Sequence, residues 1–471
     1  MPSSVTKKET PVRRVLRGTA YLGAAQIMRI ALRAVYIIVL ARFLGPELYG
    51  LFNYGLGWYL AFMSLTLLGF DLILGKEGGQ EGVDADTFVA ATFRVQLAVT
   101  FPTALVCWLV ALALEDPNIS MILGVFSIAL MGRSIAAWAS FVFISREKSN
   151  RVFWLESTCR MLEALCGTLA LLMGGSLFEV VVIHALFWWV QAIWGLYELS
   201  AHRLLLIPNR VGDIIRSLGG APIVLGLAGV FQVWIVQGPI ILFRQLGGND
   251  ALLGQIALAF QLFGLLAGLS WVILRAVLPH LSKSVRAGRS ADLTFANLLG
   301  QLTIVGAGAI TVITYFFGDT VLQWLVGNEY DAAGRFLPYT VAATAAFTIG
   351  VGAHQILAAH GKYTAILCGT ATGAVIMTGV MLVTWSLSPH LAPFLSLGAG
   401  LVAWMIVVGW AVYRVTPFSL MKVVWIPLTV SVLGITIGHT VLPLGVVFAV
   451  VSTATIFLAW AWYMKPLKRS S

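Results

Sequence analysis

The stretch at residues 20–45 reads AYLGAAQIMRIALRAVYIIVLARFLG, and it is long and apolar enough to cross a lipid bilayer as a helix. Two arginines, Arg29 and Arg33, interrupt its middle and lie about one helical turn apart. A guanidinium group is costly to place in hydrocarbon, so charged residues inside such spans normally face a water-filled or paired interior. The stretch therefore predicts a membrane protein with a positively charged interior.

Composition extends this interpretation to the whole chain. Of its 471 residues, 59% are hydrophobic and only 11% are charged, with a mean hydropathy of +0.90, whereas soluble domains carry about a quarter charged residues. Apolar runs of spanning length recur along the chain, and no polar segment between them is long enough to form a separate core. The sequence thus predicts an all-α polytopic membrane protein with about fourteen transmembrane helices and no soluble catalytic domain, and so not an enzyme. The predicted spans are 19–43, 47–73, 88–114, 119–145, 150–174, 177–201, 217–243, 251–281, 297–325, 333–359, 363–387, 391–413, 419–439 and 443–464.

The basic residues predict how the chain crosses the membrane. Lysines and arginines crowd into both termini and every second loop, whereas the other loops hold only Arg42, Arg244 and Arg335. Cytoplasmic loops are enriched in Lys and Arg, so both termini are expected in the cytoplasm. This topology explains the net charge of +10 without a nucleic-acid partner. The first span follows a long tail and contains arginines, so it is expected to be an uncleaved anchor.

Two loops on the expected outer side resemble each other. After the first span the chain reads LARFLGPELYG, and after the seventh it reads LFRQLGGNDALLG. The matching residues are Arg42, Leu44, Gly45 and Gly50 in the first loop and Arg244, Leu246, Gly247 and Gly254 in the second. Repeated halves around a central site are a transporter design, but two unrelated glycine turns would also give so short a match. The predicted organisation is a cytoplasmic tail (1–18), an N-lobe (19–201), a cytoplasmic inter-lobe loop (202–216), a C-lobe (217–414), two further spans (415–464) and a cytoplasmic tail (465–471).

Three segments resemble a known family. Residues 40–76, LARFLGPELYGLFNYGLGWYLAFMSLTLLGFDLILGK, resemble the opening of the bacterial Wzx-type polysaccharide flippases, which belong to the MOP superfamily. Residues 325–339, LVGNEYDAAGRFLPY, and residues 278–282, LPHLS, resemble later segments of the same family. The resemblance implies two six-helix lobes around a central cavity, here with two additional C-terminal helices. Many members carry an acidic residue midway along the seventh span, where this chain has Gly238.

Charged residues recur on single faces of three spans. Helical spacing places Gln26, Arg29, Arg33 and Tyr36 on one face of the first span, and Glu156, Arg160, Glu163 and Gly167 on one face of the fifth. Arg133 lies at mid-depth in the fourth span. Arginine suits phosphate because its planar fork can donate two hydrogen bonds while staying charged. The predicted substrate-binding residues are Gln26, Arg29, Arg33, Arg133 and Arg160.

Several of these residues have a second interpretation. Arg160 has Glu156 and Glu163 on its own face, so it is equally consistent with a structural ion pair. Glu163, with Glu156 beside it, is the candidate for coupling to protons or sodium ions. The polar residues His184, Trp188 and Gln191 share a face of the sixth span, and His354 and Gln355 lie in the tenth; these five are interpreted as satisfied interior residues. Asp71, near the inner end of the second span, is interpreted as interfacial.

The predicted function is an inner-membrane flippase for undecaprenyl-pyrophosphate-linked oligosaccharide, serving exopolysaccharide, capsule or O-antigen synthesis by alternating access. The expected partners are this anionic lipid-linked glycan, membrane lipids and polysaccharide polymerase or export machinery. No cofactor is expected and no metal, because no cysteine or histidine spacing suits one. Three alternatives remain open: a MATE-like multidrug exporter, a membrane polysaccharide polymerase or ligase, and a non-transporting partner of a synthesis complex.

Overall fold

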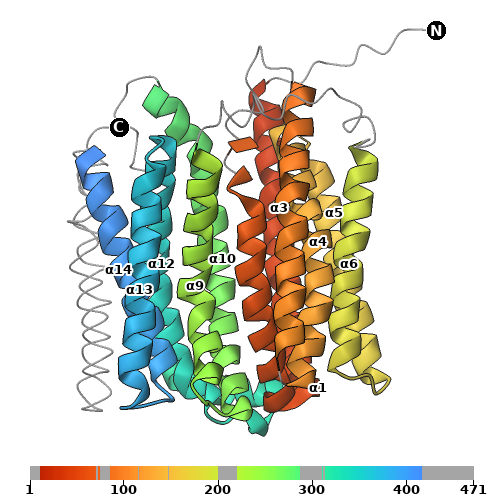
Figure 1. Ribbon diagram of the computed structural model, residues 1–471, viewed down its shortest axis with the longest axis vertical. Coiled ribbons are helices and arrows are strands. Elements are labelled where there is room, and N and C mark those ends of the chain that lie inside the picture. Colours follow the sequence, from red (N-terminus) through yellow and green to blue (C-terminus); the bar gives the residue numbers. More distant parts are fainter. Residues whose placement is uncertain are drawn as a thin grey trace. The chain divides into compact units, whose positions relative to one another are not determined.

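The computed structural model describes residues 11–70, 73–74, 85–114, 116–146, 148–199, 220–286, 310 and 313–415. These residues form helices joined by short turns, and none of them is in a β-strand (Figure 1). The helices are α1 (Pro11–Leu67), α3 (Ala85–Ala113), α4 (Pro117–Ser145), α5 (Ser149–Leu172), α6 (Leu177–Glu198), α9 (Ala221–Gln245), α10 (Asp250–Arg286), the short η1 (Asn328–Tyr330), α12 (Ala333–Ala359), α13 (Tyr363–Trp385) and α14 (Ala392–Val415). Within these ranges, eight helices are long and apolar enough to cross a membrane. The prediction of an all-α polytopic membrane protein is confirmed.

The helices follow the predicted spans to within a few residues, with one correction. Helix α1 begins at Pro11 and continues to Leu67, so the predicted tail at residues 1–18 is helical from Pro11 onward. Its one non-helical residue is Gly45, where φ is 68°, and this break separates the first two predicted spans. The inter-lobe loop, most of the ninth span and the last two spans lie outside the described residues, as does Asp71.

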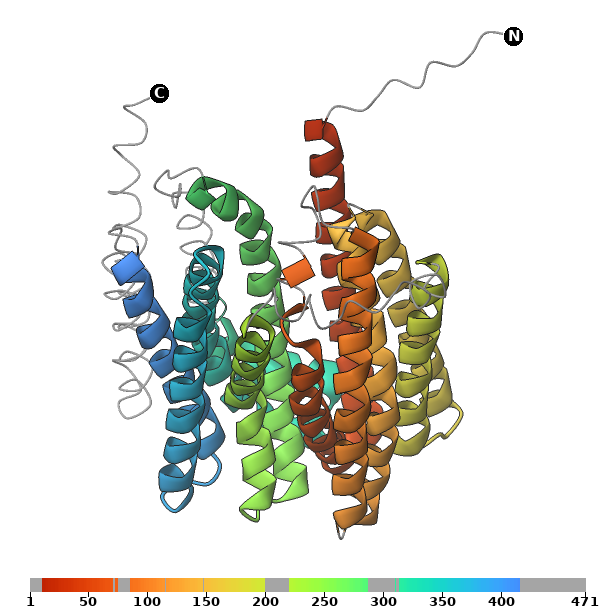
Figure 2. The same ribbon diagram turned by 45° about the horizontal axis from the view of Figure 1, so that its top comes forward.

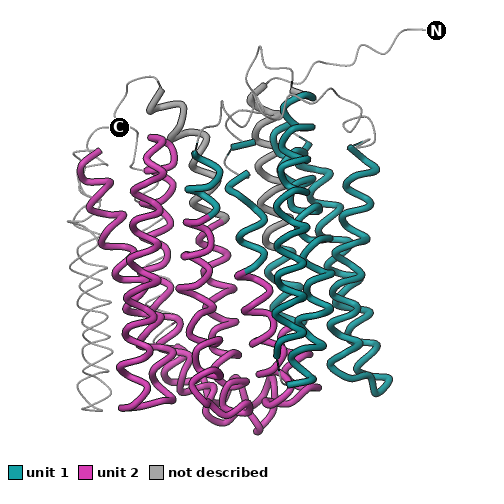
Figure 3. Tube along the Cα trace, in the orientation of Figure 1, with its two compact units in different colours: residues 1–36, 62–226 teal, residues 37–61, 227–471 magenta. Residues whose placement is uncertain are grey.

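The chain divides into two compact units (Figure 3). Unit 1 contains residues 1–36 and 62–226, and unit 2 contains residues 37–61 and 227–471. The middle of α1 therefore packs with the second half of the chain, although the sequence alone placed all of α1 in the first lobe.

In unit 1, helix α4 forms the centre. It packs against α3 and α6, and α5 packs against α6 (Figures 1 and 2). The side chains of Phe126, Trp138 and Phe143 on α4 are fully buried. A Cβ atom at Gly132 would lie 3.0 Å from the backbone nitrogen of Trp189, so glycine lets α4 and α6 approach closely at mid-length.

In unit 2, helix α12 is the most buried of the described membrane helices. It packs against α10 and α14, and α14 packs against α13. The indole of Trp404 on α14 is fully buried. It lies against Gly350 of α12 and Gly369 of α13, where added Cβ atoms would fall 2.6 and 3.3 Å from its ring. Small residues at these crossings allow close helix packing, as is common inside membranes.

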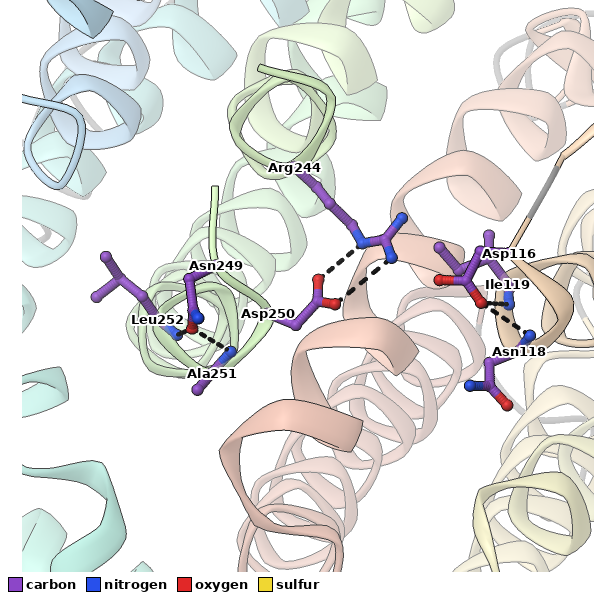
Figure 4. Close-up of polar contacts among 8 residues, drawn as sticks. All are labelled: Asp116, Asn118, Ile119, Arg244, Asn249, Asp250, Ala251 and Leu252. Carbon is purple, nitrogen blue, oxygen red and sulfur yellow. Dashed lines mark hydrogen bonds and ion pairs between the residues drawn. The ribbon is translucent and has the colours of Figure 1, made fainter. Parts of the chain in front are cut away.

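The two loops that resemble each other have the same backbone feature. Gly45 and Gly247 both have positive φ, 68° and 94°, a conformation that suits glycine because it has no Cβ atom. After Gly247, the Asn249 side chain accepts hydrogen bonds from the backbone nitrogens of Ala251 and Leu252 and so caps α10 (Figure 4). The guanidinium of Arg244 binds the Asp250 carboxylate with Nε to Oδ1 at 2.7 Å, which joins the end of α9 to the start of α10.

The two later glycines of this repeat pack against each other's helices within unit 2. A Cβ atom on Gly254 would collide with the backbone carbonyl of Pro46, and one on Gly50 would lie 2.8 Å from the Gly254 nitrogen. The adjacent Tyr330 hydroxyl is buried and donates to the Ala41 carbonyl at 2.9 Å. Burial raises the pKa of Tyr330 above its usual value, which keeps this donor protonated. The repeat thus forms a tight crossing of α1 and α10.

Substituting Gly254 by alanine is expected to destabilise the protein by about 1–3 kcal/mol, because the clashing atoms belong to the backbone and cannot rotate away. Gly268 on the same helix is the matched control, since a Cβ atom there would meet nothing within 4 Å. Gly268→Ala should be neutral or slightly stabilising through helix propensity. Thermal unfolding of the purified variants in detergent measures the difference. Equal unfolding midpoints for the two variants would contradict the tight crossing.

Candidate functional site

Two arginines of unit 1 meet at one tryptophan. The Arg133 guanidinium carbon, on α4, lies 4.9 Å from the centre of the Trp188 ring on α6, and that of Arg160, on α5, lies 3.8 Å from it. Both distances are within the range of cation–π attraction. The close approach of α4 and α6 at Gly132 places Arg133 within reach of Trp188. The structure therefore brings together two of the predicted substrate-binding residues.

One buried carboxylate bridges the arginine and a histidine. Glu163 Oε2 forms an ion pair with Arg160 Nη1, and Glu163 Oε1 lies 2.6 Å from His184 Nδ1. The Glu163 side chain is 6% exposed and that of Arg160 is 13% exposed. The structural ion pair that the sequence allowed for Arg160 is present.

Helix α6 completes the cluster with three side chains spaced by about one turn. The Trp188 indole nitrogen donates to His184 Nε2 at 3.0 Å, and Arg160 Nη2 donates to Gln191 Oε1 at 3.1 Å. We call the six connected residues the Trp188 cluster. Its members are Arg133, Arg160, Glu163, His184, Trp188 and Gln191.

Of the two acidic residues that share a helical face with Arg160, the structure pairs one with it. The sequence placed Glu156 beside Arg160 as a second acidic neighbour, but the only carboxylate among the described residues that pairs with Arg160 is Glu163. Glu156 Oε2 is buried and has no hydrogen-bond partner. With two guanidinium groups and one bridging carboxylate, the Trp188 cluster has a net positive charge when His184 is neutral.

The predicted residues on α1 lie close to α5 at one point. The Tyr36 hydroxyl packs where a Cβ atom of Gly167 would otherwise lie, so this glycine makes room for α1. The Tyr36 hydroxyl is buried without a hydrogen-bond partner. Arg29 and Arg33 lie on α1 as well, and both are exposed. The side chain of Gln26 lies outside the described part of the chain.

Sequence reasoning missed three members of the cluster. His184, Trp188 and Gln191 were interpreted as satisfied interior residues, and each has a hydrogen-bond partner within the site: Glu163 for His184, His184 for Trp188 and Arg160 for Gln191. Their shared face on α6 was the available signal. The sequence alone does not show that this face of α6 is turned toward Arg160 on α5.

Unit 2 contains fewer charged residues at mid-depth among those described. His354 packs edge-on to Trp271 with ring centres 5.8 Å apart, and Gln355 is buried. Gly238 takes the position where the resemblance leads one to expect an acid, and a Cβ atom there would lie 2.5 Å from Met377 Cε and 3.2 Å from the Trp234 ring, so a larger residue would require the Met377 side chain to move. The described residues of unit 2 therefore offer no carboxylate at this position.

The cluster's chemistry suits an anion better than a metal. No group of three His, Cys, Asp or Glu residues within the described ranges could hold a metal ion. Two guanidinium groups beside a neutral amide can bind the oxygens of a phosphate or carboxylate. No side chain of the cluster is a free nucleophile.

Fold and site together define a class: a multi-pass helical membrane protein with the fold of MOP superfamily transporters. The structure is similar to the lipid II flippase MurJ in an inward closed conformation, with a TM-score of 0.64 and 9% identity over 95% of this chain and 99% of that one. It is similar to an outward-facing MATE family multidrug resistance transporter, with a TM-score of 0.64 and 14% identity over 87% and 96% of the two chains. It also resembles a MOP superfamily transporter from Pyrococcus furiosus, with a TM-score of 0.64 and 12% identity over 87% and 96%, whose binding pocket of reverse polarity suggests a different function.

The sequence profile of the polysaccharide biosynthesis protein family matches residues 15–285, which is more than half of the chain. The chain belongs to this family. A search of curated proteins finds no match.

Proposed function

We propose that the protein is a flippase that moves undecaprenyl-pyrophosphate-linked oligosaccharide across the bacterial cytoplasmic membrane for surface polysaccharide synthesis. The observation that carries this proposal is the Trp188 cluster, a partly buried and net positive group inside a protein of the polysaccharide biosynthesis family. The proposed destination of the unit is exopolysaccharide, capsule or O-antigen synthesis. No bond of the substrate is made or broken, so the protein is not an enzyme.

The depth of the cluster supports a role in translocation. Arg133 lies about 24 Å along α4, and Arg160 and Trp188 each lie about 17 Å along their helices, at a rise of about 1.5 Å per residue. The hydrocarbon core of a bilayer is about 30 Å thick, so these residues lie near its middle. Charge at that depth marks a substrate or ion pathway. A pyrophosphate headgroup passing through the protein would meet this charge midway.

Arg29 and Arg33 extend the proposed site along α1. In the proposed topology the first part of α1 and α5 run in the same direction, and Tyr36 packs at Gly167. Counting back from that contact places Arg33 level with Glu163 and Arg29 level with Arg160. Both arginines are exposed within an apolar helix, which is favourable where they face water and an anionic headgroup.

In the proposed cycle, the headgroup enters from the cytoplasm while the lipid tail stays in the bilayer. The two halves of the chain, with residues 37–61 moving with the second half, then reorient and release it outside. Both termini lie in the cytoplasm, in keeping with the distribution of Lys and Arg. Glu163 is the proposed coupling residue because it bridges Arg160 and His184 and is buried.

The alternatives account less well for the charge of the cluster. A MATE-like exporter of cationic drugs needs an acidic cavity, and two arginines would repel such a substrate. A polymerase or ligase needs reactive groups, whereas the members of the Trp188 cluster are joined to one another by hydrogen bonds and ring contacts. A non-transporting partner of a synthesis complex gives no reason for a partly buried positive cluster at mid-depth.

Binding to the purified protein in detergent tests the proposal. Wild type is expected to bind an undecaprenyl-pyrophosphate-linked sugar, and Arg133→Ala should weaken this binding about ten- to a hundredfold, the range for losing one or more charge-assisted hydrogen bonds. Arg133→Lys should bind with intermediate affinity, because it keeps the charge but loses the planar fork. Binding of a lipophilic cation in place of the anionic lipid, unaffected by Arg133, would favour the multidrug exporter.

A further inference from the structure

The hydrogen bonds of His184 define its protonation state. The Trp188 indole N–H can only donate, and it points to His184 Nε2 at 3.0 Å. His184 Nε2 therefore accepts and carries no proton. The proton of the neutral ring then lies on Nδ1, where it donates to Glu163 Oε1 at 2.6 Å.

A second proton on His184 would disturb the whole cluster. It would occupy Nε2 and displace the Trp188 indole N–H. Among the described residues, the charged groups that act on His184 include Glu163 and Arg160 on α5 and Arg133 on α4. The ring of Phe126 on α4 packs edge-on to the imidazole at 5.6 Å. An imidazolium would add a third positive charge to a site that already contains two guanidinium groups.

The ring of Trp188 has a second contact that links this proton to the arginines. Arg133 and Arg160 both lie over the indole, at 4.9 and 3.8 Å from its centre. Movement of the indole away from His184 would thus also alter its cation–π contacts with both guanidinium groups. One side chain connects the histidine proton with the positions of the positive charges.

We propose that Trp188 is a positioning residue that holds His184 as the neutral Nδ1–H tautomer and thereby fixes the positive charge of the anion site between pH 6 and pH 8. This inference rests on the proposed function, since it concerns the same anion site. Its consequence is specific: an anion meets the same cluster charge at either pH, although histidine is the side chain that ordinarily changes charge in this range.

Trp188→Phe tests the contribution of the indole N–H separately from that of the aromatic ring. The variant keeps a ring beside the guanidinium groups but leaves His184 Nε2 free to take a proton. The probe is inorganic pyrophosphate, titrated calorimetrically into the full-length protein in detergent at pH 6, 7 and 8. Pyrophosphate itself changes its protonation with pH, and this affects both proteins equally. The ratio of the variant's affinity to that of wild type at each pH therefore cancels the contribution of the probe. This ratio is expected to rise roughly tenfold from pH 8 to pH 6. A tenfold gain in affinity corresponds to a difference of about one unit between the pKa of His184 in the free and in the anion-bound variant.

Three further variants isolate the cause. Trp188→Phe combined with His184→Gln should lose the acid-side gain, because the titrating ring is absent. Trp188→Leu should weaken binding at every pH, because the ring itself is removed. Trp189→Phe is the matched control, since its indole donates to the Ile128 carbonyl at 3.0 Å and not to the cluster, and it should behave as wild type.

The outcomes distinguish this inference from the proposed function. Pyrophosphate binding with a constant affinity ratio, or an acid-side gain that persists without His184, would overturn the inference alone. No pyrophosphate binding by any form would reject the anion site and the inference together.

A spectroscopic measurement tests the tautomer without requiring the Trp188 variants to fold. Nitrogen-15 spectra of histidine-labelled wild type, compared with His184→Gln for assignment, should show a protonated Nδ1 and an unprotonated Nε2 for His184 from pH 6 to pH 8. A protonated Nε2 in that range would overturn the inference.

Discussion

Replacing Arg160 with methionine is expected to destabilise the protein by about 3–5 kcal/mol, the cost of removing one partner from a buried ion pair. The reason is the environment of Glu163, whose side chain is 6% exposed and which would keep its hydrogen bond to His184 but lose its ion pair. Gln191 would also lose its partner at 3.1 Å. Thermal and chemical unfolding of the detergent-purified protein measures the loss.

Two further variants show whether the lost pairing is the cause. Adding Glu163→Gln to Arg160→Met removes the unpaired charge and should recover most of the stability, but it should not restore polysaccharide export. Arg151→Met is the control, because Arg151 pairs with Glu198 at 2.9 Å while 52% exposed. Exposed pairs contribute about 1 kcal/mol or less. A stable Arg160→Met protein that does not export would instead show that the pair serves function alone.

The fold was largely predictable because a bilayer leaves few choices. Backbone groups in hydrocarbon must be satisfied internally, so each apolar run of sufficient length becomes a helix. The predicted span at 333–359 coincides with α12, and most others differ from their helices by a few residues. The break at Gly45 was visible as a glycine before Pro46. The packing of residues 37–61 with unit 2 was not predictable, because it depends on contacts between segments far apart in the sequence.

The site was predictable only in part, for a similar reason. Buried charge is conspicuous in an apolar sequence, so Arg133, Arg160 and Glu163 were identified by depth and helical face. Face analysis finds neighbours on one helix, and it paired Arg160 with Glu156 as readily as with Glu163. The distinction between the two depends on His184, which approaches Glu163 from another helix.

The glycines show how local sequence fixes these interhelical contacts. Gly132 admits the α6 backbone beside Arg133, and Gly167 admits the Tyr36 hydroxyl one turn from Glu163. A side chain at either position would push a helix away from the Trp188 cluster. The small residues therefore set the spacing at which the arginines and the tryptophan meet, although nothing in their own chemistry points to a site.

Reversing the charge of Arg29 and Arg33 together is expected to abolish polysaccharide export while leaving the protein folded. Both side chains are exposed, so glutamate at these positions removes no buried packing. In the proposed site, however, the change replaces two positive charges with two negative ones along the path of a pyrophosphate. Like charges about 4 Å apart at an effective dielectric constant near 20 repel by about 4 kcal/mol, which corresponds to a loss of roughly a thousandfold in affinity.

Surface polysaccharide in cells that depend on this protein, together with its level in the membrane, measures the effect of the Arg29 and Arg33 reversal. Lysine at both positions should retain part of the export, since the charge remains and only the planar fork is lost. Arg335→Glu is the control for charge reversal as such, because Arg335 is also exposed but belongs to the first turn of α12 in unit 2, whereas the Trp188 cluster belongs to unit 1. Export at the wild-type level from the Arg29→Glu, Arg33→Glu protein would remove α1 from the translocation path and confine the proposed anion site to α4, α5 and α6.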